Sequence, residues 1–159
     1  MGQEVYLTRA GYEKLRGDLE TLKTTERRRI SKAIGEARLL GDISENAEYD
    51  AAKDAQAHCE ARIAELEAKL ANVRIIEDQN IATDKVYIGA LVSLKDAESG
   101  EKMQYLMVST EEASFEENKL SIFSPIGKGL IGHKEGEEVS IKVPAGTLRY
   151  KILKIERPL

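Results

Sequence analysis

The chain has 159 residues, enough for one or two small domains. Charged residues make up 33 % and aromatic residues only 5 %, with no Trp, which is lean for one large core and suits a long solvated helical element joined to a modest globular domain. The formal net charge of −4 argues against binding of free nucleic acid through bulk electrostatics, so any such contact needs a local basic patch or a host macromolecule.

Cysteine usage and apolar runs indicate where the protein works. The single cysteine, Cys59, excludes an internal disulfide and fits a reducing compartment. The first residues lack the apolar segment of a signal peptide, and no run approaches the roughly 18 apolar residues of a membrane span. We therefore expect a cytoplasmic protein that does not contact a membrane.

Glycine and proline divide the chain near residue 76. All three Pro and seven of the twelve Gly follow this point, whereas the first part has no Pro. We therefore expect a helical domain over residues 1–76 and a globular domain over residues 77–159.

The first domain is predicted to contain two helices. Thr8 is the expected N-cap of the first helix. Its apolar stripe comprises Leu15, Leu19, Leu22, Ile30, Ala33, Ala37 and Leu40. The stripe of the second helix alternates steps of three and four, which is the period of a coiled-coil seam, and comprises Tyr49, Ala52, Gln56, Cys59, Ile63, Leu66, Leu70 and Val73. With a helix end at Gly41, the two stripes face each other in an antiparallel coiled-coil hairpin whose acidic tip is residues 41–46.

The second domain is predicted to be a β-sheet with one short helix. Residues 86–94, 103–109, 138–143 and 148–152 have strand-like patterns. A short helix is expected from Ser124 and Pro125 to about Ile131, because Pro suits the first helical turn. The whole chain is therefore predicted to be α+β, with a helical hairpin followed by an antiparallel sheet.

Two carboxylates at the predicted tip, Asp42 and Glu45, have two interpretations. They fit a capping box, with Asp42 as N-cap and Glu45 at the third helical position, although Ser44 is a rival N-cap. They also fit half of a divalent-cation site. Mg²⁺ often takes only one or two protein carboxylates and completes its shell with water and phosphate, so the missing ligands would come from another molecule.

Basic residues near the tip are the next candidates. Arg38 and Lys53 lie several residues from the turn on opposite arms, so the hairpin brings them to a similar height, where they could flank a phosphate backbone. The alternative is surface ion pairing with neighbouring acidic residues. The basic run 27–29, together with Lys32, fits a solvated helix face better than a binding site.

Two segments resemble a known family. Residues 37–53, Ala-Arg-Leu-Leu-Gly-Asp-Ile-Ser-Glu-Asn-Ala-Glu-Tyr-Asp-Ala-Ala-Lys, and residues 124–132, Ser-Pro-Ile-Gly-Lys-Gly-Leu-Ile-Gly, are similar to the tip and C-terminal signatures of the bacterial Gre transcript cleavage factors. The resemblance covers essentially the whole chain, and the acidic net charge is more like the GreA branch. Leu39 and Leu40 depart from the charged or polar residues often found there.

The resemblance implies a fold and a mechanism. The C-terminal domain is expected to be FKBP-like and to dock at the rim of the RNA polymerase secondary channel, while the coiled coil enters the channel. Asp42 and Glu45 would hold a Mg²⁺ shared with the polymerase. From their similar height on opposite arms of the hairpin, we expect Arg38 and Lys53 to contact the nascent RNA 3′ end. The protein would be a monomeric accessory factor for cleavage of backtracked RNA and not an enzyme in its own right.

Two other functions remain open on the sequence. One is a regulator that occupies the channel without stimulating cleavage, although the intact acidic pair argues against the inhibitory members of the family. The other is a peptidyl-prolyl isomerase or chaperone with a helical handle. The globular domain has only two Phe and no Trp, which argues against an aromatic-lined proline pocket.

Overall fold

The structure, a computed structural model, describes residues 4–41 and 46–159. The chain folds into two compact units. The helical unit spans Tyr12–Val73, and the sheet unit combines Glu4–Gly11 with Arg74–Leu159. The N-terminal strand and the first turn of the first helix therefore belong to the sheet unit, although a long helical segment separates them from it in sequence.

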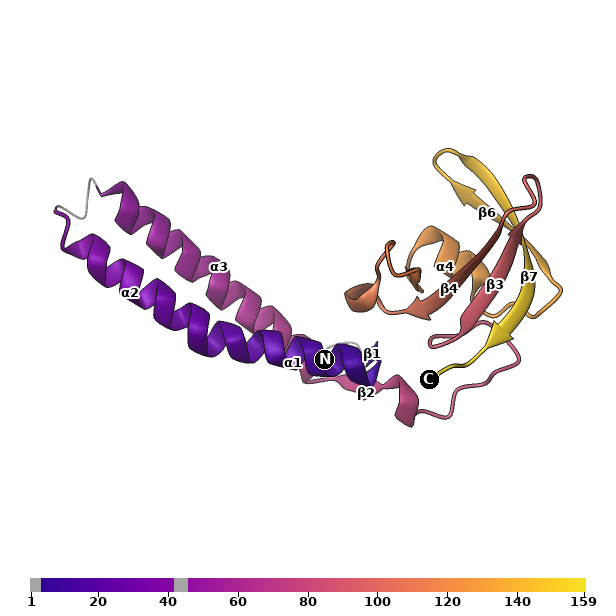
Figure 1. Ribbon diagram of the computed structural model, residues 1–159, viewed down its shortest axis with the longest axis horizontal. Coiled ribbons are helices and arrows are strands. Elements are labelled where there is room, and N and C mark those ends of the chain that lie inside the picture. The colour runs from indigo at the N-terminus through magenta and orange to yellow at the C-terminus, as the bar shows by residue number, and fades with distance from the viewer. Residues whose placement is uncertain (1–3, 42–45) are drawn as a thin grey trace. The chain divides into compact units, whose positions relative to one another are not determined.

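The helical unit is the predicted antiparallel hairpin (Figure 1). Its first arm consists of α1 (Arg9–Thr21), a π-helical stretch η1 (Leu22–Glu26) and α2 (Arg27–Arg38), and its second arm is α3 (Ala47–Leu70). Apolar side chains between the arms form the seam. They are Ile30, Ile34, Ala52, Cys59 and Ile63, with Leu19, Leu22, Ala33, Tyr49 and Ala55 packed against them.

Ion pairs join the outer edges of the two arms. Lys23 Nζ lies 3.3 Å from Glu67 Oε1. Nε and Nη2 of Arg27 each donate at 2.9 Å to the carboxylate of Glu60. These hydrogen bonds and the positive charge of Arg27 lower the pKa of the Glu60 carboxyl. Arg27 thus links the two arms of the hairpin. It also lies on the solvated helix face that the sequence predicts for the basic residues 27–29.

The π-helical stretch corrects the phase of the apolar stripe. Leu22 and Ile30 are eight residues apart, one more than the seven of a coiled-coil repeat. A wider π turn absorbs the extra residue, so that side chains on both sides of it face α3. The prediction was wrong about Leu40, which is 65 % exposed, and it omitted Ile34, which is buried. Leu40 falls outside the stripe because α2 ends at Arg38.

The sheet unit contains two sheets and a short helix. β1 (Val5–Leu7) pairs with β2 (Val73–Ile75). The larger sheet has the order β5-β4-β3-β7-β6, formed by β3 (Leu91–Asp96), β4 (Lys102–Val108), β5 (Lys119–Ser121), β6 (Glu138–Val143) and β7 (Gly146–Glu156). The short helix α4 (Pro125–Leu130) begins after its N-cap Ser124, as predicted. Two 3₁₀ turns complete the unit, η3 (Ile76–Asp78) and η4 (Thr110–Glu112).

The larger sheet differs from the prediction in two respects. It is not wholly antiparallel, because β5 runs parallel to β4. The connection through η4 carries the chain back along β4 before β5 starts, and Asn118 makes the final turn with φ of 55°. The strand expected over residues 86–94 begins only at Leu91. Gly89 interrupts it with φ of +87°, a conformation that favours glycine.

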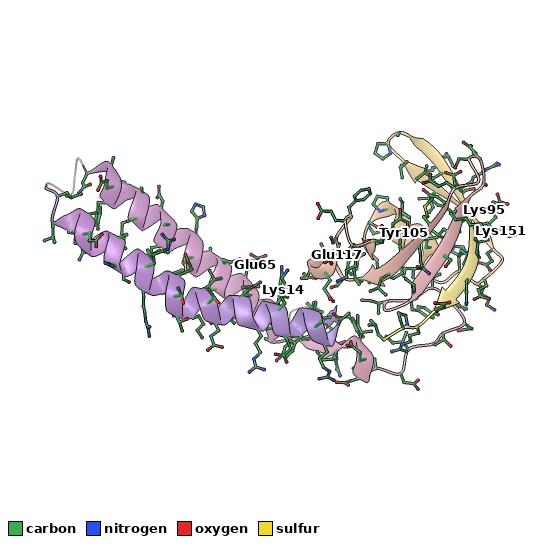
Figure 2. The ribbon with its side chains drawn as sticks, viewed as in Figure 1. Lys14, Glu65, Lys95, Tyr105, Glu117 and Lys151 are labelled. Carbon is green, nitrogen blue, oxygen red and sulfur yellow. The ribbon has the colours of Figure 1, made fainter. Side chains whose placement is uncertain are left out.

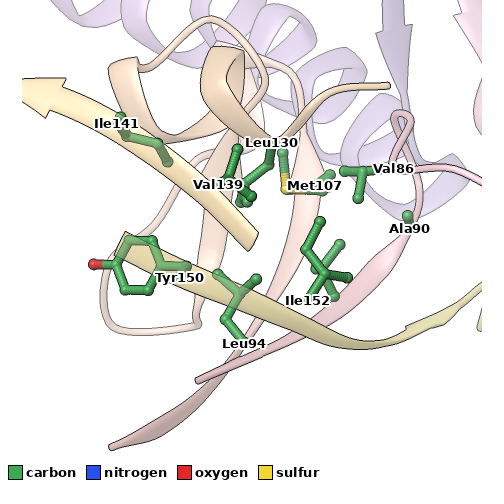
Figure 3. Close-up of a cluster of buried hydrophobic side chains, with 10 residues drawn as sticks. Val86, Ala90, Leu94, Met107, Leu130, Val139, Ile141, Tyr150 and Ile152 are labelled. Atoms are coloured by element: carbon green, nitrogen blue, oxygen red, sulfur yellow. The ribbon is translucent and has the colours of Figure 1, made fainter. Parts of the chain in front are cut away.

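The core of the sheet unit lies between the sheet and α4 (Figure 3). Alternate residues of the strands contribute to it, as expected for a sheet with one buried face. Its buried members are Val86, Ala90, Val92, Leu94, Met107, Leu130, Val139, Ile141, Tyr150 and Ile152. Burial, together with nearby negative charge, raises the pKa of the Tyr150 hydroxyl.

In the described part of the chain, no helix is long and apolar enough to cross a membrane.

Candidate functional site

The end of the hairpin is closed by Asn46. This residue is the N-cap of α3, and its Oδ1 accepts a hydrogen bond from the backbone N–H of Tyr49 at 3.1 Å. Its Nδ2 donates to the backbone carbonyl of Ala37, in the last turn of α2. The predicted capping box of Asp42 with Glu45 is therefore wrong, and so is Ser44 as N-cap, because the helix starts one residue after Asn46.

The two candidate carboxylates, Asp42 and Glu45, lie outside the described residues. What the structure shows is the scaffold on either side of them. Before them, Gly41 has φ of +140°, a conformation that side-chain-bearing residues rarely adopt. After them, α3 begins with Glu48 in its first turn. The N-cap of α3 is Asn46, and the role of Asp42 and Glu45 in binding a cation stays a prediction.

Two leucines before the turn are unusually exposed. Leu39 is 86 % exposed and Leu40 65 % exposed. They follow α2, whose C-cap is Leu39.

In residues 4–41 and 46–159, no group of three or more His, Cys, Asp or Glu side chains could hold a metal ion. The described scaffold therefore offers no complete metal site of its own.

The two basic candidates are exposed and differ in their surroundings. The Arg38 guanidinium carbon lies 5.8 Å from the ring centroid of Tyr49, on the opposite arm. Lys53 Nζ donates to Gln56 Oε1 at 2.8 Å. Among the ion pairs of the described residues, none joins Arg38 or Lys53 to an acidic neighbour. The cation–π contact places the Arg38 guanidinium beside the first turn of α3.

A second candidate site lies in the sheet unit. It is an apolar pocket of about 530 Å³. Phe123, which is 60 % exposed, and Lys128 of α4 lie on it. The full lining is Tyr6, Ile81, Tyr87, Ile88, Ile122, Phe123, Lys128 and Ile131. The sequence argument against an aromatic pocket was incomplete, because it counted Phe and Trp and left out the two tyrosines.

Charged side chains cover the outer faces of both units, as the sticks show (Figure 2). Glu65 pairs at 3.1 Å with both Arg62 and Lys69 along α3. On the sheet, Lys95 is directly opposite Lys151 of the neighbouring strand. Exposed ion pairs such as those of Glu65 contribute about 0–1 kcal/mol to stability, whereas the like charges of Lys95 and Lys151 repel each other. Neither arrangement marks a site by itself.

Comparison with known proteins completes the description of the chain. Residues 5–75 match the family model described as "Transcription elongation factor, N-terminal", and residues 81–157 match "Transcription elongation factor, GreA/GreB, C-term". The chain belongs to the GreA/GreB family of transcription elongation factors.

Two GreA sequences agree with this assignment. The chain is 49 % identical over 156 residues to the transcription elongation factor GreA of Chloroherpeton thalassium, covering 98 % of this chain and 99 % of that protein. It is 46 % identical over 157 residues to GreA of Prosthecochloris aestuarii, covering 98 % of each. Among solved structures, GreA factor homolog 1 of Thermus thermophilus is 33 % identical, with a TM-score of 0.44 and coverage of 97 % of this chain and 99 % of that one.

Proposed function

We propose that this member of the GreA/GreB family enters the secondary channel of RNA polymerase and stimulates Mg²⁺-dependent cleavage of backtracked nascent RNA. The observation that carries the proposal is the acidic sequence of residues 42–45, which connects α2 to α3, together with the packing of these two helices as a hairpin. The 24 residues of α3 make an arm of about 36 Å, long enough to reach into a channel. The protein would act in the cytoplasm, as an accessory to the polymerase.

Asp42 and Glu45 would provide part of a shared cation site. Their carboxylates are the hard oxygen ligands that Mg²⁺ prefers, and two of them suit a site that phosphate, water and polymerase residues complete. A bound Mg²⁺ would supply activation of the attacking water and stabilisation of charge on the phosphodiester. The hairpin would serve to deliver both carboxylates together into the channel.

Arg38 and Lys53 would hold the RNA backbone. Both side chains are exposed, and each lies near the described end of the hairpin on its own arm. Phosphate contacts of this kind position a nucleic acid and carry no sequence information. We therefore assign them to positioning of the RNA 3′ end and leave the metal to the carboxylates.

The apolar pocket of the sheet unit would dock on the polymerase. It combines an exposed aromatic side chain, Phe123, with a cationic rim at Lys128. An exposed apolar hollow of this size is unusual on a protein that works alone and fits a partner's apolar side chain. Docking through the sheet unit would let the hairpin present the tip without contributing most of the affinity.

A cleavage assay on stalled polymerase tests the proposal. Asp42→Ala and Glu45→Ala should each remove stimulated cleavage and leave polymerase binding intact, because the carboxylates serve the metal and not docking. Since Asn46 caps α3, the free energy of unfolding should change by no more than about 0.5 kcal/mol.

A variant with Arg38→Ala and Lys53→Ala should retain cleavage at a reduced rate. The difference from the wild-type rate should become smaller as salt screens the phosphate contacts.

The outcomes separate the alternatives. Cleavage at the wild-type rate in both carboxylate variants would contradict the proposed role of the tip. Tight binding of the wild-type protein without any cleavage would favour the regulator that only occupies the channel. Catalysis of peptide isomerisation that Phe123→Ala removes would favour the prolyl isomerase.

A further inference from the structure

The first turn of α1 is held by a carboxylate from a distant part of the chain. Glu112, in the 3₁₀ turn η4, accepts a hydrogen bond from the backbone N–H of Thr8 at 2.8 Å. Its other carboxylate oxygen accepts from the Thr8 hydroxyl. Both residues belong to the sheet unit, and Thr8 is only 6 % exposed. The contact is therefore shielded from solvent, unlike the surface ion pairs of the hairpin.

Thr8 uses its hydroxyl twice. While donating to Glu112, the same oxygen accepts the backbone N–H of Gly11 at 3.0 Å, which makes Thr8 the N-cap of α1 as the sequence predicts. Glu112 thus fixes the direction of the hydroxyl that caps the helix. Its negative charge also lies at the positive end of the helix dipole.

Gly11 provides the room for this contact. A Cβ at this position would lie 2.3 Å from Oε1 of Glu112 and 2.5 Å from its carboxyl carbon. Any larger residue would have to displace the carboxylate from Thr8. The glycine is therefore explained by the close approach of Glu112 and not by its own backbone conformation.

Two further carboxylates bind the next residue of the chain, Arg9. The backbone N–H of Arg9 donates to both oxygens of Glu77, at 3.0 and 3.1 Å, and its guanidinium pairs with Asp78 at 2.8 Å. Glu77 and Asp78 belong to η3, also in the sheet unit. Two backbone N–H groups at the start of α1, those of Thr8 and Arg9, thus donate to side chains from elsewhere in the sheet unit.

The chain passes from one unit to the other within this helix. α1 is continuous from Arg9 to Thr21, with residues 9–11 in the sheet unit and the residues after Gly11 in the helical unit. We propose that Glu112 is a positioning residue for RNA cleavage, which acts by fixing through Thr8 the point from which the hairpin starts. This inference rests on the proposed cleavage function. A misplacement of about 1 Å at a reacting centre can cost about 100-fold in rate.

The test uses Glu112→Gln in the full chain, with Glu116→Gln as the matched control. The amide has one acceptor oxygen in place of two, so either the N–H or the hydroxyl of Thr8 loses its acceptor. Glu116 is an exposed glutamate of the following loop. We expect Glu112→Gln to lower the maximal rate of stimulated cleavage about 10-fold or more, without changing the factor concentration that gives half of that rate. Glu116→Gln should match the wild type in both.

Hydrogen exchange at the Thr8 amide gives a readout that does not need the polymerase. Exchange should be faster in Glu112→Gln and unchanged in Glu116→Gln. An unchanged maximal rate in a protein with faster Thr8 exchange would overturn the positioning role while leaving the proposed function standing. A parallel loss of maximal rate and polymerase affinity would also overturn it, because it would indicate a general loss of structure. If the wild-type protein stimulates no cleavage at all, the proposed function itself fails.

A double-mutant cycle keeps the inference testable if Glu112→Gln folds poorly. Gly11→Ala should lower the melting temperature in the wild-type background, because the new Cβ collides with the Glu112 carboxylate. In a Glu112→Ala background, the same substitution should leave the melting temperature unchanged or raise it, since Ala is the better helix former. Equal effects in the two backgrounds would overturn the proposed contact.

Discussion

Asn46 closes the described end of the hairpin with both groups of its side-chain amide. The oxygen caps α3, and the nitrogen reaches back to the last turn of α2. Sequence alone could not single it out, because Asp42, Ser44 and Asn46 are all strong N-cap formers within five residues. The tip carboxylates, by contrast, are predicted from their spacing and from the surrounding motif, and their role stays a prediction. A pattern of residue types does not determine the residue at which α3 starts, because that start depends on the contact of Asn46 with Ala37 in the other arm.

Replacement of Asn46 tests this double role. Asn46→Ala should lower the free energy of unfolding by about 1–2 kcal/mol, because it removes a cap and the link to the Ala37 carbonyl, which keeps the Leu40 N–H as a donor. Asn46→Asp keeps the capping oxygen and loses the donor, so it should lie between the wild type and Asn46→Ala. Urea denaturation of the three proteins measures the difference. An unchanged transition in Asn46→Ala would show that the cap contributes nothing to the hairpin.

At the scale of elements, the π-helical stretch explains why the first arm was the harder one to predict. The second arm keeps an unbroken repeat, and its buried residues Ala52, Cys59, Ile63 and Leu66 all lie on the predicted stripe. In the first arm, the extra residue between Leu22 and Ile30 breaks the repeat. The break is visible in the sequence, but its resolution as a π turn depends on packing against α3.

Strands of the sheet unit show the same contrast. The strand predicted over residues 138–143 coincides with β6, because Val139 and Ile141 alternate with exposed residues. The prediction of a strand over residues 86–94 was wrong for residues 86–90, because β3 begins at Leu91. The backbone N–H of Val86 donates to the carbonyl of His133 at 2.9 Å, a long-range pairing that local alternation cannot reveal. Local patterns predicted the elements well where the partner strand was a sequence neighbour.

Deletion of Thr25 tests the phase argument. The deletion brings Leu22 and Ile30 to a separation of seven, so the arm can form an uninterrupted α-helix with its seam intact. The free energy of unfolding should remain within about 1 kcal/mol of the wild type. As a control, one alanine inserted after Thr25 doubles the mismatch and turns the seam residues of α2 away from α3. That variant should lose at least about 3 kcal/mol, and equal stability of the two variants would contradict the explanation.

For the whole molecule, the division into units does not follow a single cut in the chain. Residues 4–11 belong with residues 74–159, since β1 pairs with β2 and Thr8 contacts Glu112. Composition changes near residue 76 and cannot show that an N-terminal strand joins the later unit. The pocket of the sheet unit depends on this arrangement, because Tyr6 forms part of its lining.

Two units with different tasks should give separable defects. If the pocket docks on the polymerase, Phe123→Ala should raise the factor concentration needed for half-maximal cleavage about tenfold, which corresponds to about 1.4 kcal/mol, and leave the maximal rate unchanged. Phe115→Ala is the matched control, because Phe115 is 92 % exposed and does not line the pocket. Asp42→Ala should show the reverse pattern, with no cleavage at any concentration and unchanged affinity. A similar loss in Phe123→Ala and Phe115→Ala would remove the pocket from the docking surface, whereas a lower maximal rate in Phe123→Ala would mean that docking and tip chemistry are coupled.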